Sequence, residues 1–77
     1  MNLEEFITKY IPLSTQIAVF SNIDNERLFE GKARVLYKHR YGYNEDDDET
    51  LTAVLLRTVA EIEPDYNYAG WLVIAVD

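Results

Sequence analysis

The last seven residues of the chain, WLVIAVD, constrain the fold more than any other stretch. Because side chains alternate between the two faces of a β-strand, one face carries Leu72, Ile74 and Val76, and the other carries Trp71, Val73 and Ala75. Both faces are apolar. This is typical of a central strand that is covered on both sides, or of a strand that presents one face to a partner.

The length of the chain bears on which of these alternatives holds. Seventy-seven residues allow one domain, residues 1–77, and a domain of this size buries only about 60% of the surface that its unfolded chain exposes. A few short strands and one or two helices cannot easily cover both faces of a sheet. The face of Trp71 and Val73 is therefore a candidate partner-binding surface, and local cover by Tyr66 or Tyr68 is the alternative.

Cysteine is absent, which excludes disulfides, thiolate metal sites and cysteine nucleophiles. A core this small seldom supplies more than about 3 to 5 kcal/mol of stability, so self-association, for example as a homodimer, is the remaining way to add to it. Glu4 and Glu5 stand where a signal peptide needs basic residues, and no apolar run approaches the roughly 20 residues of a membrane span. We expect a cytoplasmic protein without membrane insertion.

Hydrophobic spacing predicts a helix followed by a strand pair. Asn2 and Glu5 form a capping-box pattern, and apolar residues at helical spacing follow for about two and a half turns until Pro12 ends the helix. Residues 15–20 are rich in β-branched and aromatic side chains and predict a strand. Turn formers then lead into an antiparallel partner over residues 26–33.

The second half of the chain is less clear. Residues 34–40 fit either a continued strand or a short helical turn, and Thr50 can cap a second short helix around residues 50–57, with which a strand over residues 51–56 competes. Residues 58–63 alternate and predict another strand. The fold class is thus α+β, with the N-terminal helix packed on one face of a roughly four-stranded, mainly antiparallel sheet. Gly31 marks either a bulge or a close approach of the helix.

No residue pattern supports catalysis or metal binding. His39 is the only histidine, and the sequence shows no carboxylate to orient it and no activated nucleophile beside it. A calcium loop counted from Asn44 would need glycine where Glu49 stands, so residues 44–50 read as a solvated acidic loop. We expect no enzyme, no metal and no cofactor.

Charge is strongly separated along the chain. Residues 1–43 hold six Lys or Arg against five acids, a balance of +1, whereas residues 44–77 hold one against nine, a balance of −8. Residues 32–43 interleave basic side chains with tyrosines, as single-strand nucleic-acid sites do, but the net charge of −7 opposes phosphate binding. We therefore expect a protein partner and no direct binding of nucleic acid.

An acidic surface can instead take the place of phosphates in the basic groove of a nucleic-acid enzyme. The residues that could form such a surface are Asp46, Asp47, Asp48, Glu61 and Glu63. Ordinary solubility is the other explanation of these acids.

The order of the hydrophobic segments, together with the stretch LFEGKA, resembles a group of small proteins encoded by bacterial phages and integrated mobile elements. The matching stretches are residues 3–12, 15–19, 26–33, 59–62 and 72–76, and residues 38–50 look like an insertion. The group has no established activity, so no functional residues carry over. The resemblance implies a phage or mobile-element accessory protein in the cytoplasm of a bacterium or an infected host cell. Inhibitors of host restriction or CRISPR enzymes occur in this setting. Our leading hypothesis is a non-enzymatic protein-binding module, and the alternative is an acidic nucleic-acid mimic that inhibits a host nuclease.

Overall fold

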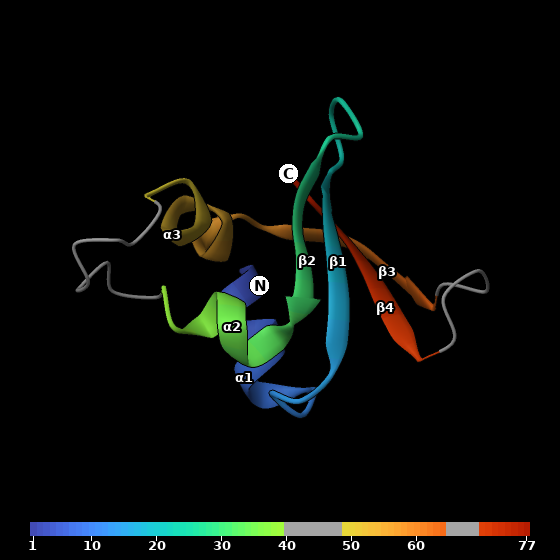
Figure 1. Ribbon diagram of the computed structural model, residues 1–77. Helices are drawn as coiled ribbons and strands as arrows, with labels where there is room; N and C mark the ends of the chain where they lie inside the picture. The colour runs from blue at the N-terminus through green and yellow to red at the C-terminus, as the bar shows by residue number, and fades with distance from the viewer. Residues whose placement is uncertain (40–48, 65–69) are drawn as a thin grey trace.

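Three helices and four strands make up the part of the chain that the computed structural model describes, residues 1–39, 49–64 and 70–77 (Figure 1). In chain order they are α1 (Leu3–Lys9), β1 (Gln16–Ser21), β2 (Arg27–Lys32), α2 (Ala33–Tyr37), α3 (Glu49–Leu56), β3 (Val59–Pro64) and β4 (Trp71–Val76). The helices lie together on one side of the sheet (Figure 1). The predicted α+β class, with a helix packed against a sheet of four strands, is confirmed.

Helix α1 begins where the capping pattern places it. The Asn2 side chain accepts a hydrogen bond from the Glu5 backbone N–H at 2.8 Å, which satisfies one of the free donors of the first turn. The helix has seven residues, shorter than predicted, because Tyr10 already forms its C-cap. Tyr10 is 63% exposed, and its ring stacks on that of Phe6 with the centroids 6.1 Å apart.

The sheet has the order β2-β1-β4-β3. The two outer pairs, β1 with β2 and β3 with β4, are antiparallel, as predicted for most of the sheet. The central pair, β1 with β4, is parallel, and the sequence does not predict this pairing. A parallel pair requires a long crossover, and here the connection between β1 and β4 includes β2, α2, α3 and β3.

Both ambiguous segments contain helices. Within residues 34–40 the described part continues α2, so the strand alternative is wrong there. Residues 51–56 belong to α3, which begins at Glu49, so Thr50 lies inside the helix rather than at its cap. The Thr52 hydroxyl donates a hydrogen bond of 2.8 Å to the backbone carbonyl of His39, which ties α3 to the end of α2.

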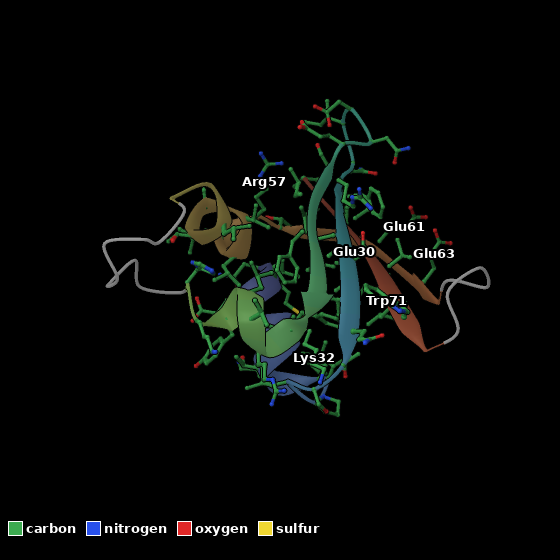
Figure 2. The ribbon with its side chains drawn as sticks, viewed as in Figure 1. Glu30, Lys32, Arg57, Glu61, Glu63 and Trp71 are labelled. Carbon is green, nitrogen blue, oxygen red and sulfur yellow. The ribbon has the colours of Figure 1, made fainter. Side chains whose placement is uncertain are left out.

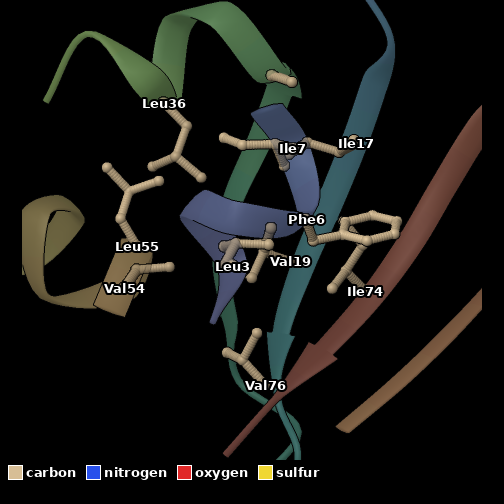
Figure 3. Close-up of a cluster of buried hydrophobic side chains, with 11 residues drawn as sticks. Leu3, Phe6, Ile7, Ile17, Val19, Leu36, Val54, Leu55, Ile74 and Val76 are labelled. Atoms are coloured by element: carbon tan, nitrogen blue, oxygen red, sulfur yellow. The ribbon is translucent and has the colours of Figure 1, made fainter. Parts of the chain in front are cut away.

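The core fills the space between the three helices and one face of the sheet (Figure 3). Ile17 and Val19 of β1 and Ile74 of β4 are fully buried under the helices. The buried apolar cluster comprises Leu3, Phe6, Ile7, Ile17, Val19, Ala33, Leu36, Val54, Leu55, Ile74 and Val76. One face of the central strands is therefore the floor of the core, as the alternation of residues 71–77 predicts.

Gly31 has neither of the two roles predicted for it. It pairs regularly with Ile17, and the register shift between β1 and β2 lies instead after Val19. The nearest side chain is not a helix residue but Phe29 of the same strand, whose Cζ would lie 3.3 Å from an added Cβ. Glycine is favoured at position 31 because the backbone φ there is +150°, a value that residues with a Cβ rarely adopt.

The turn between β1 and β2 is held by Asp24. The Asp24 carboxylate accepts a hydrogen bond of 3.0 Å from the Glu26 backbone N–H, and Asn25 adopts a positive φ of 59°. This hydrogen bond from the Glu26 backbone, together with one from the Ser21 side chain, lowers the pKa of Asp24 below the ordinary carboxyl value, because both favour the ionised form. The contribution of this carboxylate to stability is thus present above the ordinary carboxyl pKa and is lost as the pH falls through the lowered value.

Candidate protein-contact surface

The face of the sheet opposite the helices carries an apolar centre. Because Ile17 and Val19 point into the core, Ala18 and Phe20 of β1 point to the other side. The parallel register sets Val73 beside Ala18 and Ala75 beside Phe20, so side chains of both central strands meet on this face. We call it the open face, and it comprises Gln16, Ala18, Phe20, Glu30, Lys32, Glu61, Glu63, Trp71, Val73 and Ala75.

The open face joins two groups of residues that the sequence presents separately. In the antiparallel register of β3 and β4, Glu63 lies directly across from Val73 and Glu61 directly across from Ala75. Residues in such positions share one face of the sheet. Figure 2 shows Glu61, Glu63 and Trp71 on the same side of the sheet, away from the helices. The apolar and acidic candidate surfaces are thus partly one surface.

Charge is unevenly placed along the two rims of the open face. On the β2 rim, Lys32 lies beside Gln16, and Glu30 forms an ion pair with Arg27. On the β3 rim, Glu61 and Glu63 are exposed, and neither makes an ion pair within residues 1–39, 49–64 and 70–77. The β3 rim is therefore an acidic border to an apolar strip, which consists of Phe20, Val73 and Ala75.

Trp71, Val73 and Ala75 are half-buried, whereas Ala18 between them and β2 is buried. The strip, with Trp71 at its end, thus offers accessible apolar surface. Of the remaining acidic candidates, Asp46, Asp47 and Asp48 lie outside the described residues, as do Tyr66 and Tyr68.

A groove between α1 and β3 is a feature that the sequence analysis missed. It has a volume of about 390 Å³ and a mainly apolar lining, which consists of Met1, Phe6, Tyr10, Val59, Ala60, Glu61 and Ile62. The available signals were Tyr10, four residues after Phe6 on the apolar stripe of the helix, and Ile62, which alternates with two glutamates. Neither signal shows that the two elements lie side by side.

The described residues bring together no group of three or more His, Cys, Asp or Glu side chains able to hold a metal ion. Among the same residues, no helix is both long enough and apolar enough to cross a membrane.

Comparisons with protein-family models, with curated proteins and with solved structures found no match to this chain. The similarity to phage and mobile-element proteins therefore stays a hypothesis.

Proposed function

We propose that this chain is a non-enzymatic protein-binding module, an accessory protein of a bacterial phage or mobile element, and that its partner docks on the open face. The observation that carries this proposal is the apolar strip of Phe20, Val73 and Ala75 on a sheet face that no described helix covers. Contiguous apolar surface of this kind marks interaction sites on small domains.

The size of the open face indicates how a partner sits on it. Four strands about 4.8 Å apart, each with six residues at about 3.3 Å, give a face of roughly 400 Å². A standard protein–protein interface buries about 800 Å² on each partner, which is more than the open face provides. A partner that covers the apolar strip therefore also contacts a rim of the open face. The acids Glu61 and Glu63 on the β3 rim then favour a partner with an apolar centre and basic groups at its edge.

The test is a binding experiment with paired Val→Lys variants of the full chain. Val73→Lys places a charge in the centre of the open face, whereas Val35→Lys makes the same change on α2, where Val35 is 44% exposed on the helix side. We expect wild type and Val35→Lys to retain the same protein from host extract, and Val73→Lys to bind it at least about tenfold more weakly.

Trp71→Ala is the second variant on the open face, and thermal unfolding of every variant shows which of them remain folded. Sedimentation velocity of the same proteins tests whether the partner is a second copy of the chain, since a dimer would then dissociate in the open-face variants Val73→Lys and Trp71→Ala but not in Val35→Lys. Equal retention of the partner by folded Val73→Lys and by wild type would exclude the open face as the contact surface.

A second candidate function is nucleic-acid mimicry, in which the acids occupy the basic groove of a host nuclease. The observation that favours it is the placement of Glu61 and Glu63, both exposed, on one strand face with a spacing of roughly 6.6 Å. Two carboxylates at this spacing can pair with a row of cationic side chains, as successive phosphates of a nucleic acid do.

Neutralising Glu61, Glu63, Asp46, Asp47 and Asp48 with the corresponding amides tests mimicry. The expected result is weaker inhibition of host restriction or CRISPR nucleases and a loss of its salt dependence, because the attraction between opposite charges is removed. The double variant Glu4→Gln/Glu26→Gln is the matched control for Glu61→Gln/Glu63→Gln, because each removes two negative charges from the chain. Unchanged inhibition by the fivefold variant would rule mimicry out.

A further inference from the structure

Among the residues that the structure describes, the outer edge of β3 is occupied only at its beginning. Asn2 forms an isolated antiparallel bridge with Thr58, and the Val59 backbone N–H donates to the Met1 carbonyl at 3.0 Å. Beyond this point, no described residue pairs with β3 on the side away from β4. Residues 60–63 are thus an open strand edge, which ends at Pro64 because proline has no backbone N–H to donate.

The groove lies along this edge on the helix side. Its lining includes the exposed parts of Met1 and Tyr10 and the Phe6 ring, together with Ile62 of β3 itself, which is 42% exposed. An additional strand beside β3 would place every second side chain in or next to this apolar groove. The groove therefore gives the open edge a site for side chains as well as for backbone.

The other face of the same edge is acidic. Ile62 lies across from Ile74 of the core, so it points to the helix side, whereas its neighbours Glu61 and Glu63 point to the open face. The side chains of an added strand would thus alternate between an apolar groove and two carboxylates. A segment in which apolar and basic residues alternate matches both surroundings.

The same acids select against pairing between two copies of β3. In three registers a two-fold axis between antiparallel β3 strands sets like charges opposite each other: Glu61 faces Glu63 of the other copy in one register, and in the other two either Glu61 or Glu63 faces its own counterpart. Like charges directly opposite each other destabilise a strand pair. Edge acids of this kind are a known protection against self-association, and they leave a basic strand as the matching occupant.

We propose that the edge of β3 and the adjoining groove bind an extended segment of a partner protein, with alternating apolar and basic residues, as a fifth strand of the sheet. Main-chain hydrogen bonds to residues 60–63 hold the segment, its apolar side chains enter the groove beside Ile62, and its basic side chains face Glu61 and Glu63. This site is separate from the apolar strip of the open face and is expected to bind even if that strip takes no partner.

The test is an NMR titration of the full-length, nitrogen-15-labelled chain with a short peptide in which valine and lysine alternate. We expect amide shifts concentrated at residues 60–63 and at the groove. Glu61→Gln/Glu63→Gln should weaken binding about tenfold, as should Ile62→Lys. Ile23→Lys is the matched control, since Ile23 is 86% exposed in the turn between β1 and β2, and it should bind as wild type does.

Two further measurements distinguish binding at the β3 edge from binding at the open face. Phe20→Ala, which truncates a side chain of the apolar strip on β1 and adds no charge beside Glu61 or Glu63, should leave affinity for the peptide unchanged, and a peptide alternating valine with glutamate should not bind. The absence of shifts at millimolar valine–lysine peptide would overturn the proposal. So would shifts centred on Val73 and Ala75 instead of the β3 edge, because they would assign the peptide to the open face.

Discussion

Ile74→Ala is expected to lower the free energy of unfolding by about 2 to 5 kcal/mol, which leaves much of the protein unfolded at room temperature. Ile74 has 0% of its surface exposed, on a central strand with Val19 on one side and Ile62 on the other. Phe6 of α1 lies over it (Figure 3). The substitution removes buried methyl groups and leaves a cavity between helix and sheet, in a domain whose total stability is of the same size.

Urea unfolding followed by circular dichroism measures this effect. Ile74→Val removes one methylene group and should cost about 0.5 to 1.5 kcal/mol. The loss of stability should thus increase with the number of carbon atoms removed at this position. Leu56→Ala removes apolar atoms at an exposed position of α3 and should stay within about 0.5 kcal/mol of wild type. An Ile74→Ala protein with the midpoint of wild type would mean that the helices do not pack on this face of the sheet.

Gly31→Ala is expected to destabilise the protein by about 1 to 3 kcal/mol through the backbone alone. The φ of +150° at Gly31 is rarely adopted by residues with a Cβ, and the new methyl group would also lie 3.3 Å from Cζ of Phe29. The strand must then change its backbone angles, or Phe29 must move away from its present position.

Gly70→Ala is the matched control, because Gly70 also has a positive φ, of +84°, but nothing lies within 4 Å of an added Cβ. Its cost in unfolding experiments shows what a positive φ costs at a position where the new methyl group meets no other atom. We expect a loss of stability in both variants and a larger loss for Gly31→Ala. If Gly31→Ala were as stable as wild type, the backbone of β2 at this position would differ from the one described.

The elements that were predicted well are those with strong local signals. The cap of α1 at Asn2 and the alternation within β4 are readable because the residues involved lie within a few positions of each other. Helix α2 was ambiguous because its stability comes from elsewhere in the chain. Its first backbone N–H groups, of Ala33 and Arg34, donate to the carbonyls of Thr15 and Leu13 at 2.9 Å.

The parallel pairing of β1 and β4 could not be predicted because it joins residues far apart in the sequence. One signal was available, since near-continuous apolar strands are typical of parallel pairs in the middle of a sheet. The stretch Ile17 to Phe20 has this character, as does β4. The signal gives the position of the strands in the sheet, but it does not give their direction.

The candidate surface was predicted in parts. Trp71 and Val73 were identified from the apolar second face of β4, and Glu61 and Glu63 from their alternation in β3. Their placement on one face depends on the register of the two strands, which pairs Glu63 with Val73. A shift of one residue in that register would have moved both glutamates to the helix side, so the sequence alone could not decide it.

A protein partner on the open face would cover Trp71, which is the one tryptophan of the chain. Incorporation of 5-fluorotryptophan therefore places a single fluorine-19 label there, which stays distinct from any tryptophan of the partner. On addition of the partner retained by wild type and Val35→Lys, we predict a shifted, broadened Trp71 resonance that is protected from solvent. An unchanged resonance at saturating partner would contradict the claim, because the partner would then bind elsewhere.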